Sequence, residues 1–301
     1  MLLAGRNGSA MVASMKHVVC WWLICMSCKV VANELPTVAG PAMGTTYRVI
    51  LGSELPGQTV GAVHRAIEQR IEQLEQATST WRKQSDVSRF NRASADHWVP
   101  VSNDLIAIVQ IAQAVHLFSE GAFDITIAPL LRLSQPVSPA ARENVLRYVG
   151  MRHLDVRSDP PALKKTKGGV ELDLGGIAPG YAVDQIGELL LELGSSSHLV
   201  ELGGEIRAWG YQSDNTCWTV QVRGLHDTKK RVLNPGQALA FASSRPDHVL
   251  IDPRTGREAR CRYSVISVEA STCAEADAKA VARLINAQTE HVETVRNPAD
   301  E

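Results

Sequence analysis

The chain has 301 residues, of which 45% are hydrophobic and 21% are charged. This balance is that of an ordinary globular protein, and the length suits one large domain or two closely joined halves. The formal net charge is -1, from 31 Lys and Arg against 32 Asp and Glu, with no basic run interleaved with aromatic residues. We therefore expect no nucleic-acid partner.

The start of the chain has the pattern of a secretory signal peptide. Lys16 and His17 precede a short apolar run, Val18–Met26, and small residues then lead to Ala32. The run is too short to span a membrane as a helix, and the order of basic, apolar and small residues is typical of a signal peptide. We predict a signal peptide over 1–32, which implies an exported protein, in the periplasm or on the outer face of the cytoplasmic membrane. A buried helix is the alternative.

The cysteines leave two questions open. Cys25 and Cys28 lie at the end of the apolar run, where a lipoprotein cysteine would lie, so a lipid anchor is the alternative to plain cleavage after the signal peptide. Cleavage leaves three cysteines, Cys217, Cys261 and Cys273, whose spacing fits no zinc site. One disulfide and buried, reduced side chains are both consistent with this set.

Periodicity and turn signals predict a mixture of helices and strands. In chain order these are a strand at Thr45–Leu51, helices at Val60–Ala77, Asp104–Phe118 and Pro139–Val149, a strand at Glu171–Leu174, a helix from Gly180 or Tyr181 to Leu193, strands at Leu199–Leu202, Glu205–Trp209, Trp218–Val222, Ala238–Ala242, His248–Ile251 and Tyr263–Glu269, and a helix at Cys273–Asn286. Helices and strands do not alternate one for one, which favours an α+β fold with mixed or antiparallel sheets and packed helices. We predict one two-lobed domain over 33–288 and a flexible tail over 289–301.

A glycine-rich turn is the most informative local feature. Asp173 and Leu174 end a predicted strand, Gly175 and Gly176 follow, and a helix is predicted to begin a few residues later. Glycines let the backbone approach an anion closely, and the start of a helix offers unpaired N–H groups. From these residues alone, a cradle for a diphosphate and a turn that only packs strand on helix are equally open.

Three further segments carry candidate functional residues. The segment 202–205 (LGGE) places two glycines and an acid in an apolar strand, which predicts a bulge or a tight hairpin. Asp252 begins an Asp-Pro turn and is expected to accept a hydrogen bond from the backbone two residues on. Asp277 lies in an Ala-rich predicted helix. Taken alone it reads as a solvated helix carboxylate, and the alternative is a ligand for a hard cation such as magnesium.

Taken together and in order, these segments resemble the FAD:protein FMN transferases, the ApbE family. The matching segments are 42–47 (AMGTTY), 79–81 with 88–91 (STW and SRFN), 121–126 (GAFDIT), 173–184, 202–205, 251–256 and 275–278 (EADA). The resemblance implies an ApbE-like fold and an enzyme that splits FAD with a divalent cation. It also implies that FMN moves through its phosphate onto a Thr or Ser hydroxyl of an acceptor flavoprotein, and that AMP leaves. The expected acceptor is a membrane-bound or exported redox protein.

The same resemblance assigns site residues by position. Those implied to contact FAD are Met43, Trp81, Ala122, Phe123, Asp124, Asp173, Pro179 and Ile251, and the Trp81 ring is suited to stacking on the isoalloxazine. Those at the magnesium site are Gly176 and Ala280 through their carbonyls, Asp277, and Val281. The candidate catalytic base is His248.

Three departures from the family pattern bear on activity. Pro179 stands where the family usually has Lys, so a cation and a backbone donor are missing. Val281 stands where the family usually has Thr, and its side chain cannot bind a metal. His248 lies one residue before the usual position of the base, which Val249 occupies, and on a strand this shift reverses the face. The alternative functions are a non-catalytic FAD-binding protein or flavoprotein assembly factor and, less well supported, a hydrolase that cleaves FAD to FMN and AMP.

Overall fold

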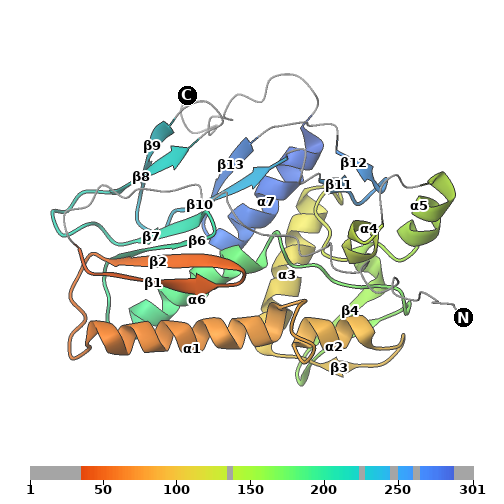
Figure 1. Cartoon of the computed structure of the whole chain (residues 1–301), viewed down its shortest axis with the longest axis horizontal. Helices are drawn as coiled ribbons and strands as arrows, with labels where there is room; N and C mark the ends of the chain where they lie inside the picture. Colours follow the sequence, from red (N-terminus) through yellow and green to blue (C-terminus); the bar gives the residue numbers. More distant parts are fainter. Residues whose placement is uncertain (1–34, 134–137, 224–227, 245–249, 260–264, 288–301) are drawn as a thin grey trace, which may run out of the picture.

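The computed structural model describes residues 35–133, 138–223, 228–244, 250–259 and 265–287. At its centre lies a six-stranded sheet in the order β1-β2-β6-β7-β10-β13, in which every neighbouring pair is antiparallel (Figure 1). Its strands are β1 Thr37–Ala42, β2 Thr45–Leu51, β6 His198–Leu202, β7 Glu205–Trp209, β10 Ala238–Ser243 and β13 Val265–Ala270. The predicted α+β class is confirmed.

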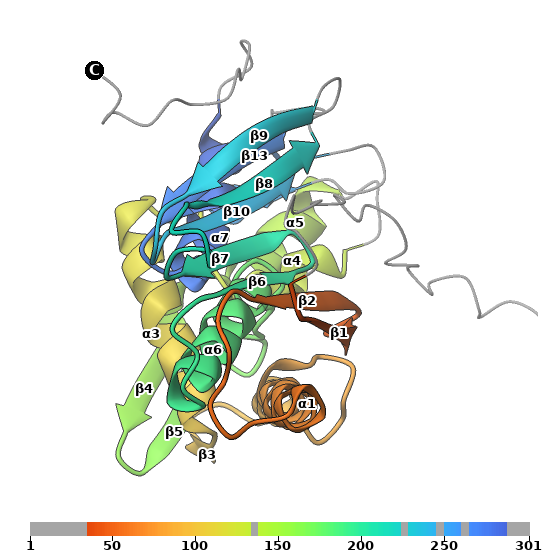
Figure 2. The ribbon, with the colours of Figure 1, turned by 90° about the vertical axis from the view of Figure 1, so that its left-hand side faces the viewer.

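Helices cover one face of this sheet in two layers. The inner layer is α6 (Ala178–Glu192) against β6 and β7, and α7 (Cys273–Asn286) against β10 and β13. The outer layer is α1 (Val60–Thr78), which packs on α6, and α3 (Asn103–Phe118), which packs on α7 (Figure 2). The main hydrophobic core fills the space between sheet and helices.

The other face of the sheet carries a two-stranded ribbon. β8 (Trp218–Arg223) pairs with β9 (Thr228–Leu233), and Trp218 is fully buried against apolar side chains of the sheet. The remaining elements are α2 Asp86–Arg92, β3 Val99–Pro100, α4 Ala128–Leu131, α5 Pro139–Leu146, a 3-10 turn at Met151–His153, β4 Leu154–Ser158, β5 Pro161–Lys165, β11 Ile251–Asp252 and β12 Arg257–Glu258. β3, β5 and β4 form a small sheet beside α3.

Four helices begin where a side-chain oxygen caps them. Thr59, Ser102, Ser138 and Thr272 accept hydrogen bonds from backbone N–H groups three residues on, at the starts of α1, α3, α5 and α7. Each bond satisfies a donor that has no partner inside the helix. These caps explain why the four helix starts were readable from the sequence.

Most predicted elements are present, and one strand is wrong. Glu171–Leu174 forms no strand, apart from a single bridge between Glu171 and Ile127. Instead the side-chain amide of Asn91 donates to the carbonyl of Leu172 at 2.9 Å, and the backbone N–H of Leu172 donates to Oδ1 of Asn91 at 2.7 Å. An amide side chain thus takes the place of a neighbouring strand, which explains why an apolar run without a strand partner is stable here.

Several elements were absent from the sequence interpretation, including β1, α2 and β9. The predicted helix Pro139–Val149 ends earlier, at Leu146, and the Gly180 start of α6 moves back to Ala178. Among the described residues, Cys217 and Cys273 are free, and no helix is long and apolar enough to cross a membrane. The signal peptide over 1–32, Cys25, Cys28, Cys261 and the tail over 289–301 lie outside the described residues.

Candidate functional site

The glycine-rich turn leads into α6, whose first turn lies against α7. The backbone N–H of Gly180 donates to Oδ2 of Asp277 at 3.2 Å. A Cβ atom at Gly180 would lie 2.4 Å from the carbonyl oxygen of Cys273, so this approach of the two helices requires glycine. Asp277 is only 3% exposed. The interpretation of Asp277 as a solvated carboxylate is therefore wrong, because the fold buries it at the start of a helix, where the dipole favours negative charge.

Asp184 on α6 fixes the start of α7. Its carboxylate accepts the backbone N–H groups of Cys273 and Ala274 at 2.8 and 2.9 Å, and Arg207 of β7 donates to it at 2.7 Å. Burial raises the pKa of Asp184, and these donors oppose that rise. The carboxylate satisfies N–H groups that have no partner within α7. It thereby holds in place the helix that carries Asp277.

Gly176 lies where the turn meets both α7 and the 121–126 segment. A Cβ atom at Gly176 would lie 3.0 Å from Cγ2 of Val281 and 3.4 Å from Cε2 of Phe123. The structure thus brings together Gly176, Val281 and Phe123, which lie far apart in the sequence. Pro179 is half-buried in the first turn of α6, two residues after the N-cap Ile177.

The segment 121–126 is held by its own acid. Asp124 is 6% exposed, and its carboxylate accepts the backbone N–H of Thr126 at 2.8 Å and that of Met151 at 3.2 Å. Its neighbour Ala122 is fully buried. The Asp124 side chain therefore holds this segment in shape from inside the protein.

Two other predicted FAD contacts lie beside this segment. The backbone N–H of Asp173 donates to the carbonyl of Ile125 at 2.8 Å, and the Asp173 carboxylate accepts the N–H of Gly175 at 3.0 Å. Ile251 is buried in β11, and the predicted turn that follows it is confirmed, since Asp252 accepts the N–H of Arg254 at 2.9 Å.

A pocket of about 430 Å³ opens between the 121–126 segment and the turn after β11. It is lined by His116, Gly121, Asp124, Leu146, Val149, Gly150, Arg152, Pro253 and Arg254. The side chain of Arg254 lies within 3.5 Å of the place that a Cβ atom of Gly121 would take. The two segments that the sequence assigned to FAD binding are therefore neighbours in space.

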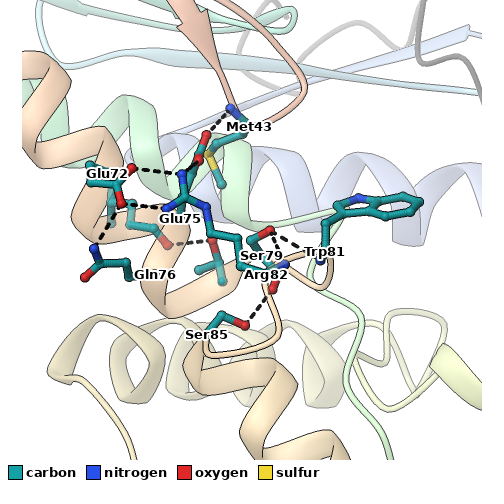
Figure 3. Close-up of polar contacts among 10 residues, drawn as sticks. Met43, Glu72, Glu75, Gln76, Ser79, Trp81, Arg82 and Ser85 are labelled. Atoms are coloured by element: carbon teal, nitrogen blue, oxygen red, sulfur yellow. Dashed lines mark hydrogen bonds and ion pairs between the residues drawn. The ribbon is translucent and has the colours of Figure 1, made fainter.

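Met43 lies at the tip of the β1–β2 hairpin and is tied to the end of α1. Met43 and Gly44 have positive φ angles of 50° and 80°, which suits the two-residue turn. The backbone N–H of Met43 donates to Oε1 of Glu75 at 2.8 Å. Arg82 forms an ion pair with the other oxygen of Glu75 and, at 2.6 Å, with Glu72 (Figure 3).

Trp81 precedes Arg82 in the loop between α1 and α2. Ser79 Oγ accepts the backbone N–H groups of Trp81 and Arg82, both at 3.3 Å, and Ser85 Oγ donates to the carbonyl of Ser79 (Figure 3). The Trp81 side chain is 78% exposed. A large ring on a fixed loop with this exposure is free to stack on a flat ligand.

The Asp277 carboxylate is suited to binding a hard cation. Burial raises the pKa of Asp277, and the hydrogen bond from Gly180 offsets only part of this rise. Such a carboxylate is stable when it is neutral or paired with a cation, and magnesium prefers oxygen donors. Asp277 and the carbonyl of Gly176 would hold it. Among the described residues, no group of three or more His, Cys, Asp and Glu side chains is arranged to hold a metal ion.

The two remaining predicted metal residues add no side-chain oxygen. Val281 presents methyl groups, and Ala280 is fully buried within α7, where a carbonyl belongs to the hydrogen-bond ladder of the helix. His248, the candidate base, and Val249 lie outside the described residues. The sequence interpretation missed Glu75, Arg82 and Asp184 as residues that hold the site, because each acts through a partner distant in sequence.

Comparisons with known proteins give matches over most of the chain. A family model described as the ApbE family matches residues 43–300. The chain is 28% identical over 288 residues to a protein of Vibrio cholerae named FAD:protein FMN transferase, covering 87% of this chain and 84% of that protein. A protein of the same name from Escherichia coli strain K12 is 29% identical over 276 residues, covering 82% and 77%.

Solved structures give the same result for the fold. The flavin transferase ApbE from Vibrio cholerae superposes with a TM-score of 0.76 at 28% identity, over 85% of this chain and 88% of that one. The apo flavinyl transferase ApbE of Pseudomonas stutzeri also gives 0.76 at 28% identity, over 86% and 84%.

Proposed function

The chain belongs to the ApbE family, and on that premise we propose that it is an exported, magnesium-dependent FAD:protein FMN transferase. The acceptor would be a Thr or Ser hydroxyl of a flavoprotein, and AMP would be released. One observation carries the proposal: Asp277 is buried against the N–H of Gly180 where the glycine-rich turn enters α6. This arrangement supplies anion-binding backbone and a cation-binding carboxylate side by side.

The proposed reaction exchanges one phosphorus–oxygen bond for another. The hydroxyl oxygen of the acceptor bonds to the phosphorus of the FMN half of FAD. The bond from that phosphorus to the bridging oxygen breaks, AMP leaves with the bridging oxygen, and the hydroxyl proton departs to a base. The product is a phosphodiester between FMN and the acceptor, and catalysis depends on positioning and charge neutralisation.

Each part of the site has a role in that reaction. The turn through Gly176 and the start of α6 would bind the diphosphate through backbone groups. Trp81 would stack on the isoalloxazine, and the backbone of the 122–124 segment, with Ile251, would line the remainder of the FAD pocket. A bound magnesium ion would supply positive charge to the diphosphate. His248 is proposed as the base.

Two observations favour the non-catalytic alternative, in which the chain binds FAD without transferring FMN. Val281 contributes methyl groups beside Gly176, where a hydroxyl would be a further ligand. Pro179 places no cation at the start of α6. FAD binding with no transfer to any Thr-bearing acceptor would identify this alternative.

Export and the partner are part of the same proposal. The signal peptide over 1–32 would deliver the enzyme to the periplasm or to the outer face of the cytoplasmic membrane, with a lipid anchor at Cys25 or Cys28 as the alternative to cleavage. The acceptor would then be a membrane-bound or exported redox protein. Mass spectrometry of the mature N-terminus from a membrane and a soluble fraction separates the two outcomes.

The proposed activity is tested with the mature protein, FAD, magnesium and an acceptor that carries a Thr. Flavin fluorescence that stays on the acceptor after denaturation supports the transfer. Release of free FMN and AMP without labelled acceptor would identify a hydrolase instead.

A further inference from the structure

Glu205 is a buried carboxylate that the proposed site does not yet use. It is the first residue of β7, where side chains alternate between the two faces of the sheet. Ile206 points to the ribbon side, whereas Arg207 reaches Asp184 on α6. Glu205 therefore lies on the face that α6 and α7 cover, and it is 8% exposed.

The Glu205 carboxylate has no donor from another side chain among the described residues. Its one hydrogen bond there comes from its own backbone N–H. Arg207, the cation on the same strand, is engaged with Asp184 at 2.7 Å. A buried charge without a partner is costly, so a carboxylate kept in such a place needs a reason.

Asp277 is the charged neighbour of Glu205. The thiol of Cys273, at the start of α7, donates to the carbonyl of Ile206 at 3.6 Å, so α7 packs against the start of β7. Asp277 lies one turn further along α7 and is buried, as Glu205 is. Two buried carboxylates therefore face one space between β7 and α7. The fold supplies oxygen donors there and leaves the positive charge to come from elsewhere.

The glycine turn before β7 keeps Glu205 in position. Gly203 and Gly204 have φ angles of 67° and 120°, so the β6–β7 hairpin turns within two residues. A Cβ atom at Gly203 would lie 3.3 Å from Oε2 of Glu205 and 3.1 Å from Cγ2 of Thr45. A larger residue at Gly203 would displace the carboxylate.

We propose that Glu205 is a ligand, together with Asp277, of the divalent cation of this site. The inference rests on the proposed function, and it adds a second carboxylate from β7. That carboxylate takes the place of the oxygen that Val281 does not offer. Carboxylate oxygens suit magnesium or manganese better than softer ions.

The test measures binding of Mn²⁺ alone, without FAD or acceptor, by titration calorimetry and by the electron paramagnetic resonance of free Mn²⁺. Glu205→Gln keeps the shape of the side chain, and we expect it to weaken binding at least tenfold. Glu201→Gln is the matched control. Glu201 lies on the same hairpin and accepts the N–H of Gly204 at 3.1 Å, which a glutamine oxygen can still do, so its Mn²⁺ affinity should be unchanged.

Thermal unfolding gives a second reading that a merely structural role would not reproduce. In Glu205→Gln the gain in Tm on adding Mg²⁺ should shrink, whereas in Glu201→Gln it should match that of the parent. Adding Val281→Thr to Glu205→Gln should restore part of the lost Mn²⁺ affinity.

Unchanged Mn²⁺ affinity in Glu205→Gln, or equal losses in Glu205→Gln and Glu201→Gln, would overturn the assignment. Tight Mn²⁺ binding that depends on Glu205, in a protein that transfers no FMN, would support the ligand role and refute only the proposed transferase activity. The two failures are therefore distinguishable.

Discussion

Gly180 donates its backbone N–H to the carboxylate of Asp277 at 3.2 Å, across the contact between α6 and α7. The contact depends on a residue without a side chain, since a Cβ atom at Gly180 would overlap the carbonyl of Cys273. It places a carboxylate at the N-terminus of a helix that the glycine-rich turn enters. The start of α6 can therefore offer backbone N–H groups to a phosphate, and the neighbouring Asp277 carboxylate can bind a cation.

Trp81→Ala should weaken FAD binding by about 1 kcal/mol, or about fivefold, because the stacking surface is lost. The free energy of unfolding should be unchanged, since the Trp81 side chain is 78% exposed. Titration of FAD fluorescence measures the affinity. Trp98→Ala is the control, because Trp98 is also exposed but lies against Arg157 and Lys164. Equal losses in both variants would remove Trp81 from the site.

Glu75→Ala should raise the KM for FAD, because the Met43 backbone loses its acceptor and Arg82, in the loop that carries Trp81, loses one of its two ion pairs with α1. Glu72→Ala removes the other carboxylate that contacts Arg82 but leaves Met43 bonded, so its KM should stay close to that of the parent. The ion pairs themselves are at least partly exposed to solvent and contribute little to stability. The same KM in both variants would show that the link to Met43 has no role.

Val281→Thr should lower the Mg²⁺ concentration needed for half-maximal transfer, because a hydroxyl replaces a methyl group beside Gly176. Val281→Ala, which adds no oxygen, controls for the change of packing.

Pro179→Lys should lower the KM for FAD by restoring a cation near the diphosphate. A large gain in turnover in either variant indicates a site that has decayed; no gain, with the parent already active, indicates that these groups are dispensable.

The stability of the protein should fall in mild acid because of His198. Its ring is fully buried, stacks on Trp209 at a centroid distance of 4.8 Å, and has its pKa lowered from 6.5 to about 4 by burial. Between these pH values the unfolded chain binds a proton that the native chain does not. The free energy of unfolding should thus drop as pH falls from about 6.5 to about 4, by up to about 3 kcal/mol.

Urea unfolding at several pH values checks this prediction. His198→Phe keeps an aromatic ring against Trp209 and removes the titrating group, so its stability should depend less on pH over the same range. An identical pH dependence in the parent and the variant would show that other groups control acid unfolding.

The helices and strands could be predicted from the sequence wherever the residues that determine them are close together in the chain. Helix α7 has the predicted bounds Cys273–Asn286, and the capped helices start within one residue of expectation. The prediction of a strand at 171–174 failed because the hydrogen-bond partner of this segment is the side chain of Asn91, about eighty residues earlier. No local sequence pattern reveals such a partner.

The candidate site was only partly readable for the same reason. Glycines and a carboxylate in a familiar order pointed to Gly176 and Asp277, but the burial of Asp277 depends on the packing of α6 against α7. The supporting residues Glu75, Arg82 and Asp184 act through tertiary contacts. The sequence placed Glu205 in a predicted turn. The face of the sheet on which its side chain lies follows only from the pairing of β6 with β7.

The most direct test of the account compares the parent protein with Asp277→Ala. Each is incubated with FAD, a Thr-bearing acceptor, and either Mg²⁺ or EDTA, and flavin fluorescence on the denatured acceptor is measured. Circular dichroism confirms that Asp277→Ala is folded. We expect Mg²⁺-dependent labelling by the parent and at least a hundredfold less by Asp277→Ala, because a metal ligand is lost. Equal labelling by both proteins would contradict it.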